Sequence, residues 1–142
     1  MVVGGYAVNL HGHNRNTKDL DIWIATDPVN AELVAAALQE FRFAPSVARG
    51  PRCRAQGKVF AFGREPYRVD LLTSPDALDF EECYKRRREF ILDAVRVPTV
   101  SFEDLLEQAS GRPQDLADVH KLRKKPNRST RAAPNARKRR KK

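Results

Sequence analysis

Cysteines and long apolar runs are scarce in this sequence of 142 residues. The two cysteines, Cys53 and Cys83, lack the spacing of a metal site, so we expect free thiols in a reduced, cytoplasmic protein. No apolar run approaches the roughly 18 residues that a membrane-spanning helix needs. The first residues also lack the basic segment and the long apolar stretch of a signal peptide. A membrane protein and a metal-binding cysteine framework are therefore not expected.

Acidic residues are absent from one end of the chain. The sequence holds 27 Lys and Arg against 18 Asp and Glu, but residues 123–142 contain 11 of the basic residues and none of the acidic ones. We therefore predict one domain at 1–122, which is nearly neutral, followed by a disordered basic tail at 123–142. Such a tail attracts RNA, DNA or an acidic partner in a salt-dependent way, and a solubilising extension explains it equally well.

Apolar periodicity and turn residues predict an α+β domain with a mixed β-sheet flanked by helices. A hairpin is predicted from two apolar runs separated by "REP", and a capping box from Ser101 and Asp104. The expected strands are 1–3, 19–25, 58–63, 67–73 and 89–101 (one strand or a pair), and the expected helices are 6–10, 30–41, 79–87, 102–109 and 114–124.

Two aspartates alternate with apolar residues in the expected strand at 19–25. Asp19 and Asp21 therefore share one face of that strand, and Asp70 is available from another strand of the same sheet. Neighbouring carboxylates repel one another unless a cation neutralises them, and Mg²⁺ prefers such oxygen ligands together with substrate phosphates. The three aspartates are thus the predicted metal ligands and catalytic residues. An ordinary strand with one solvated face also explains the Asp19–Asp21 pair when it is taken alone.

A pair of glycines precedes these aspartates at an expected strand-to-helix turn. Gly4 and Gly5 would let backbone N–H groups approach a phosphate, and Arg15 and Thr17 would add a charged and a hydroxyl contact. These four residues are the predicted nucleotide-binding residues, although a Gly-Gly pair by itself is mostly a turn. Trp23 lies on the aspartate face and could stack on a base or pack on the sheet.

The stretch "VVGGYAVNLHGHNRNTKDLDIWI" (2–24) resembles the first motif of the minimal nucleotidyltransferases, relatives of the DNA polymerase β superfamily. The family pattern is a glycine-rich turn, a short helix and then Arg-x-Thr-x-Asp-x-Asp, which matches "RNTKDLD" (15–21). A third family aspartate matches Asp70 in "YRVDLL". The segment "SFEDLLEQASGRPQDLADVHKL" (101–122) resembles the closing helices of the same proteins, which occur in bacterial abortive-infection and toxin–antitoxin systems.

This resemblance implies a nucleotidyltransferase fold and Mg²⁺-dependent transfer of a nucleoside monophosphate from an NTP, with pyrophosphate leaving. The implied acceptor is an RNA, such as the 3′ end of a tRNA, or a hydroxyl of a partner protein. Asp19 and Asp21 would bind the ions, while Asp70 would complete the site and activate the acceptor hydroxyl.

The chain also departs from the family pattern. Relatives usually carry a helix before the first strand, and they place lysines where this chain has "LLEQASGR" (105–112) and Gln114. Such lysines would neutralise triphosphate charge in the transition state. The second hypothesis is therefore a catalytically weakened relative that binds a nucleotide or RNA as a partner protein. A third is a nucleic-acid-binding domain that acts through its basic tail.

Overall fold

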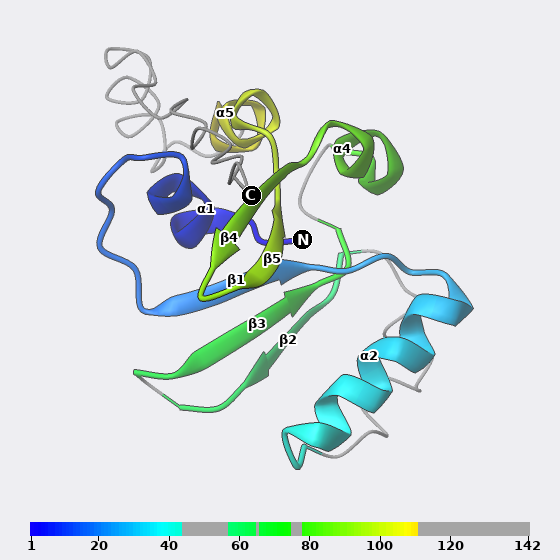
Figure 1. Cartoon of the computed structure of the whole chain (residues 1–142). Helices are drawn as coiled ribbons and strands as arrows, with labels where there is room; N and C mark the ends of the chain where they lie inside the picture. Colours follow the sequence, from blue (N-terminus) through cyan, green and yellow to red (C-terminus); the bar gives the residue numbers. More distant parts are fainter. Residues whose placement is uncertain (44–56, 65, 75–77, 111–142) are drawn as a thin grey trace, which may run out of the picture.

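In a computed structural model, the described residues are 1–43, 57–64, 66–74 and 78–110 (Figure 1). They form an α+β arrangement of four helices and two small sheets, which confirms the predicted class. In chain order the elements are α1 (Gly4–Leu10), β1 (Asp19–Trp23), α2 (Pro28–Glu40), β2 (Val59–Phe62), β3 (Arg68–Leu72), α4 (Phe80–Arg86), β4 (Arg88–Leu92), β5 (Val95–Thr99) and α5 (Phe102–Ser110). The predicted last helix, the predicted basic tail and Cys53 lie outside the described residues.

The larger sheet is mixed, as predicted, with the strand order β1-β3-β2. Strand β1 runs parallel to β3, and β2 pairs with β3 as the predicted antiparallel hairpin. The segment predicted as one strand or a pair is the antiparallel hairpin β4–β5. Its turn places Asp93 and Ala94 at φ 46° and 69°, which is the left-handed geometry of the tight turns that match strand twist.

The segment before α1 links the two sheets. The strand predicted there is reduced to one bridge residue, Val2, which pairs antiparallel with Ile22 and parallel with Thr99. The Val3 amide also donates to the Asp21 carbonyl at 3.0 Å. This short segment thereby holds the β4–β5 hairpin beside β1 and positions the start of α1.

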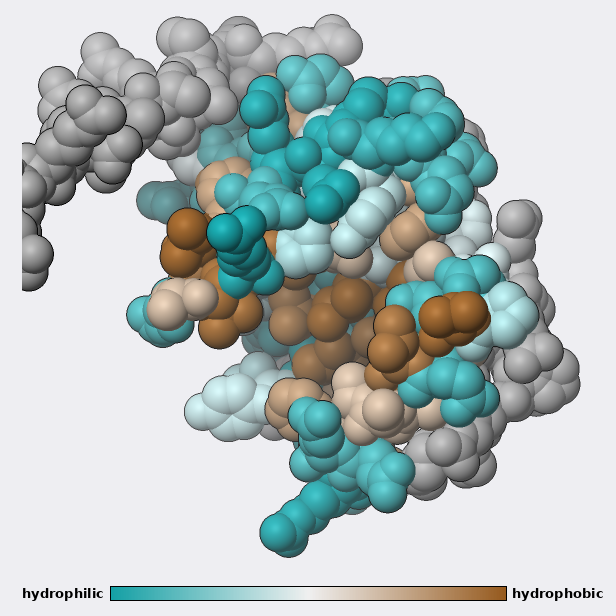
Figure 2. Space-filling view, turned by 45° about the vertical axis from the view of Figure 1, so that its right-hand side comes forward, coloured by the Kyte–Doolittle hydropathy of each residue, from teal (hydrophilic) through white to brown (hydrophobic). Residues whose placement is uncertain are grey.

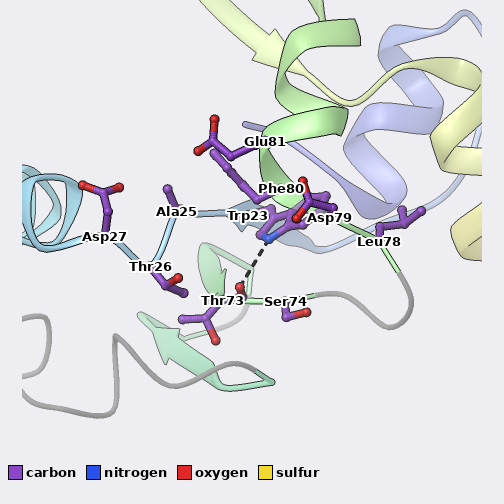
Figure 3. A pocket seen from close by; sticks show the side chains of 10 residues that line it. All are labelled: Trp23, Ala25, Thr26, Asp27, Thr73, Ser74, Leu78, Asp79, Phe80 and Glu81. Atoms are coloured by element: carbon purple, nitrogen blue, oxygen red, sulfur yellow. Dashed lines mark hydrogen bonds between the residues drawn. The ribbon is translucent and has the colours of Figure 1, made fainter.

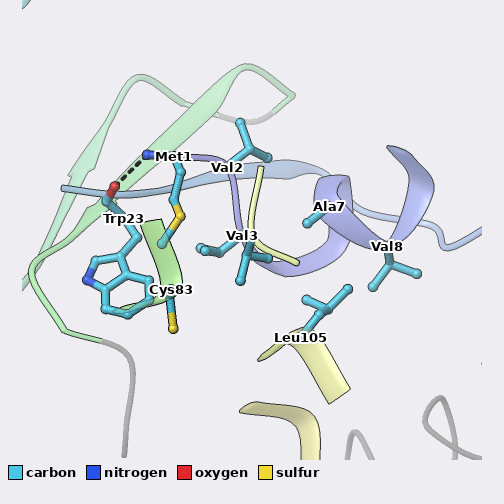
Figure 4. Packing of buried hydrophobic residues seen from close by; sticks show 9 residues of the cluster. Met1, Val2, Val3, Ala7, Val8, Trp23, Cys83 and Leu105 are labelled. Atoms are coloured by element: carbon cyan, nitrogen blue, oxygen red, sulfur yellow. Dashed lines mark hydrogen bonds between the residues drawn. The ribbon is translucent and has the colours of Figure 1, made fainter. Parts of the chain in front are cut away.

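Two apolar clusters lie on opposite faces of the larger sheet. Figure 1 shows α1, α4, α5 and the β4–β5 hairpin on one side of this sheet and α2 on the other. The first cluster includes Met1, Val3, Ala7, Val8, Trp23, Cys83, Val100 and Leu105 (Figure 4). Within it the Met1 nitrogen donates to the Trp23 carbonyl at 2.7 Å. This cluster fixes the face of β1 that also carries the aspartates.

The second cluster packs α2 on the opposite face, through residues that include Ile24, Ala35 and Leu38. Helix α2 begins at Pro28, two residues before the prediction, because the Asp27 carboxylate caps it by accepting from the Asn30 amide at 2.9 Å. An apolar groove of about 310 Å³ lies between α2 and the sheet. Figure 2 shows apolar residues gathered in a hollow near the middle of one face.

The start of α5 follows the predicted capping box. The Ser101 hydroxyl accepts from the Asp104 amide at 3.1 Å and donates to the Asp104 carboxylate at 2.7 Å. The same carboxylate pairs with Arg86 of α4 at 2.7 Å, so one buried aspartate joins the two helices. Among the described residues, no helix is both long and apolar enough to cross a membrane.

Candidate functional site

The three predicted aspartates lie on one face of the larger sheet. The parallel register sets Asp19 opposite Arg68 and Asp21 opposite Asp70. Residues that face each other across neighbouring strands point to the same side of a sheet, and alternate residues of one strand do so too. The alternation read from the sequence therefore places Asp19 and Asp21 correctly, and the register adds Asp70 beside them.

An arginine that the sequence analysis missed lies among these carboxylates. Asp70 is only 7% exposed, and Arg68 donates to its two oxygens at 2.8 Å each, from Nε to Oδ1 and from Nη2 to Oδ2. The Nη1 atom of Arg68 lies 4.0 Å from Asp19 Oδ2. The signal was available, because Arg68 stands two residues before Asp70 and so shares its face. The hydrogen bonds and charge of Asp70 raise the pKa of the Arg68 guanidinium above its ordinary value.

The two carboxylate oxygens of Asp19 differ in their polar contacts. Its Oδ1 is buried and has no hydrogen-bond partner among the described residues, while its side chain as a whole is 35% exposed. A buried polar atom without a partner is destabilising, so this oxygen is suited to accept a donor or to coordinate a cation. Because the side chain is still partly open to solvent, such a ligand can reach it.

The two glycines predicted as a turn are the first residues of α1, which begins two residues before the predicted helix, and they lie directly against two other site residues. Gly4 has φ +63°, and a Cβ there would come within 3.0 Å of the Asp21 carboxyl carbon and closer still to Oδ2. A Cβ at Gly5 would lie 2.6 Å from Thr17 Oγ1. Only glycine lets the backbone approach these side chains so closely, and the left-handed backbone angle at Gly4 also favours glycine. Both glycines therefore pack directly against residues of the candidate site.

The loop between α1 and β1 is fixed by a side chain that the sequence analysis also missed. Asn9 Oδ1 accepts from the Arg15 amide at 2.6 Å, and Asn9 Nδ2 donates to the Arg15 carbonyl at 3.0 Å. Thr17 Oγ1 donates to the Asp19 carbonyl at 3.3 Å. Both predicted loop residues, Arg15 and Thr17, are thus tied by their backbone or side chain to elements that border the carboxylates.

The three aspartates supply the oxygen ligands that Mg²⁺ prefers. In this structure, however, one of them is paired with an arginine side chain. Among the described residues, no group of three or more His, Cys, Asp or Glu is arranged to hold a metal ion. In this arrangement Arg68 engages both oxygens of Asp70. The unpartnered Oδ1 of Asp19 and the hard oxygen donors fit Mg²⁺ once the guanidinium leaves Asp70.

Trp23 shares the aspartate face but is unsuited to stack on a base. It is 1% exposed, its ring packs edge-on against Phe80 at 5.2 Å, and Nε1 donates to the Thr73 carbonyl at 3.4 Å. Packing, the second of the two interpretations, is therefore the one that the structure supports.

A polar pocket of about 210 Å³ lies beside Trp23, beyond the carboxyl ends of β1 and β3 (Figure 3). Its acidic side chains are Asp27, Asp79 and Glu81. Two of these already serve as helix caps, because Asp27 accepts from a backbone amide of α2 and Asp79 from one of α4. The lining includes none of the predicted metal-binding or nucleotide-binding residues, so this pocket is a feature distinct from the carboxylate face.

Comparison with protein-family models and with curated proteins finds no match for the chain.

Proposed function

We propose that this chain is a Mg²⁺-dependent nucleotidyltransferase that transfers a nucleoside monophosphate from an NTP to a hydroxyl of an RNA, such as a tRNA 3′ end, or of a protein. The observation that carries the proposal is the convergence of Asp19, Asp21 and Asp70 on one sheet face, with Gly4 packed against Asp21. The resemblance of residues 2–24 to the minimal nucleotidyltransferases supports the same chemistry. It also suggests a toxin–antitoxin setting with a partner protein.

The carboxylates have separate roles in this proposal. Asp19, Asp21 and Asp70 would hold Mg²⁺, which when bound supplies positive charge that stabilises the reacting phosphates. Asp70 takes the proton from the acceptor hydroxyl. The hydroxyl oxygen then forms a bond to the α-phosphorus, and the bond between that phosphorus and the pyrophosphate oxygen breaks. Since Arg68 engages both oxygens of Asp70, proton transfer requires that pairing to open first.

The glycine turn and the loop would hold the triphosphate. Gly4 and Gly5 bring their backbone close to Asp21 and Thr17, so their amide groups lie beside the carboxylates where the triphosphate would bind. Arg15 supplies positive charge for the triphosphate, and Thr17 supplies a hydroxyl. The Asn9 hydrogen bonds keep the loop backbone at Arg15 in place and so reduce the ordering needed when the nucleotide binds.

The test is transfer of label by the full chain. The protein is incubated with α-phosphate-labelled NTPs, Mg²⁺ and either total tRNA or cell lysate, and labelled RNA and protein are separated on gels. Asp21→Asn is the diagnostic variant, and Asp93→Asn is the matched control. Asp93 lies in the β4–β5 turn, where asparagine tolerates the left-handed φ of 46°. We expect label with the wild type and with D93N and none with D21N. Absence of label with the wild type, or equal label with D21N, overturns the proposal.

One observation favours a second candidate, a nucleotide- or RNA-binding relative without turnover. The Arg68–Asp70 pair occupies the carboxylate that would act as the base. This candidate predicts that the wild type binds an NTP or RNA in equilibrium measurements but transfers no label. If binding depends on the basic tail alone, deletion of residues 124–142 abolishes it while Asp19→Asn leaves it unchanged.

A further inference from the structure

Arg68 is placed as the counter-ion of the carboxylate face. Its guanidinium makes a two-pronged pair with Asp70 and reaches toward Asp19, which stands directly opposite on the neighbouring strand. The Asp70 side chain is only 11% exposed, whereas the Arg68 side chain is 39% exposed. Burial of an ionised carboxylate requires a partner, and Arg68 supplies that partner from the solvent side of the pair.

The position of Arg68 is incompatible with a divalent cation on the same oxygens. Like charges a few ångströms apart repel strongly where solvent is partly excluded. A metal ion bound to Asp70 and Asp19 would therefore have to displace the guanidinium from Asp70. Because the Arg68 side chain is partly exposed, it can turn toward solvent without opening either apolar cluster, since neither cluster includes it.

We propose that Arg68 is a displaceable counter-cation: it neutralises Asp70 in the metal-free protein and is exchanged for the divalent cation when the site is loaded. This inference rests on the proposed metal-dependent function. It makes Arg68 a positioning residue, which acts through Asp70 and does not touch the reacting atoms. Since the exchange breaks two charge-assisted hydrogen bonds, metal binding is weaker than the carboxylates alone would allow.

The inference is tested by metal affinity, which needs no turnover. Mn²⁺, which suits the same carboxylate ligands as Mg²⁺, is titrated calorimetrically into the full-length wild type, Arg68→Met and Arg68→Lys. Arg96→Met is the matched control, because Arg96 is 82% exposed on β5 and its ion-pair partner Glu89 lies on β4. We expect R68M to bind Mn²⁺ about tenfold more tightly than the wild type or better, which is a difference of about 1.4 kcal/mol. R96M should match the wild type.

The lysine variant distinguishes the effect of the two-pronged contact with Asp70 from the effect of the positive charge. Lysine keeps the positive charge but cannot make the two-pronged contact, so R68K should bind Mn²⁺ more tightly than the wild type and less tightly than R68M. If R68K binds as weakly as the wild type while R68M binds tightly, charge alone explains the effect and the exchange is refuted. If R68M proves unfolded without metal, R68K carries the comparison with the wild type.

The remaining outcomes distinguish this inference from the proposed function. Equal Mn²⁺ affinity in the wild type, R68M and R68K refutes the exchange but leaves a metal-dependent enzyme intact. No Mn²⁺ binding by any of the three refutes both. Binding by R68M but not by the wild type refutes the exchange, because Arg68 then blocks the cation and is not displaced by it. The rise in melting temperature on adding Mn²⁺ should follow the same order as the affinities.

Discussion

Alanine at Gly4 should destabilise the protein through two separable effects. The first is the backbone angle, because φ +63° is left-handed and disfavours any residue with a Cβ by about 1–2 kcal/mol. The second is the contact with the Asp21 carboxylate, because an added methyl in a filled space destabilises by about 1–3 kcal/mol. Together they predict that Gly4→Ala lowers the free energy of unfolding by about 2–5 kcal/mol.

Two other glycines provide controls that isolate each effect. Gly57 has φ +71°, but a Cβ there meets nothing within 4 Å, so Gly57→Ala reports the backbone angle alone. Gly5 is not in the left-handed region, yet a Cβ there lies 2.6 Å from Thr17, so Gly5→Ala reports crowding alone. The loss of backbone freedom in the unfolded chain is common to all three variants and cancels in the comparison.

The assay is urea denaturation followed by circular dichroism, with the free energy of unfolding compared across the three variants. A double-mutant cycle with Asp21→Ala adds a direct test, since removal of the carboxylate should relieve most of the crowding at Gly4. If Gly4→Ala destabilises no more than Gly57→Ala, or if Asp21→Ala relieves nothing, then Gly4 does not pack against Asp21. The placement of the turn at the carboxylate face would then be wrong.

Three further predictions concern the α4–α5 junction and the buried thiol. Ser101→Ala should lower the free energy of unfolding by about 1 kcal/mol in urea denaturation, because the cap of α5 is lost. Burial alone would raise the pKa of Asp104, but hydrogen bonds from Arg86 and Ser101 and the Arg86 charge outweigh burial and lower it. The ionised carboxylate therefore stabilises the fold above the ordinary pKa near 4, and this contribution is lost as the pH falls through the lowered pKa. The stability advantage of the wild type over Asp104→Asn should accordingly shrink between pH 6 and pH 3; an unchanged advantage would contradict the pairing. Burial, and then the Asp104 charge, raise the pKa of the Cys83 thiol to about 11. In a Cys53→Ser background a disulfide reagent should thus modify Cys83 slowly at pH 8 and quickly in urea, and fast modification of the folded protein would show that the thiol is accessible.

Local sequence patterns predicted most of the described elements. Alternation marked β1, the separation of two apolar runs by a turn marked the β2–β3 hairpin, and Ser101 with Asp104 marked the start of α5. Each of these signals acts between residues that are close in sequence, so the sequence alone carries it. The errors in helix bounds are small; α2 begins at Pro28, two residues before the predicted range, where Asp27 and Pro28 are local start signals in the sequence.

The contents of the carboxylate face depend on contacts that no local pattern encodes. The parallel register of β1 and β3 is set by packing across the sheet, and it decides that Arg68 stands opposite Asp19. The spacing of two residues puts Arg68 on the same face as Asp70, but only the register brings it beside Asp19. Trp23 is a second example of a long-range contact that local patterns do not encode. Alternation alone placed it on the aspartate face, but Phe80 of α4 packs against its ring.

The bridge at Val2 has a consequence for how the protein folds. Both hairpins pair segments close in sequence and can form early, because closing a short loop is fast. Val2, in contrast, pairs with Ile22 and also with Thr99, across most of the described chain. Pairing over such a separation requires a large loss of chain entropy before the favourable contacts form. We therefore expect this pairing to limit the folding rate. We expect the union of the two sheets through Val2 to be the slow step, and substitutions that weaken it to act mainly on the rate of folding.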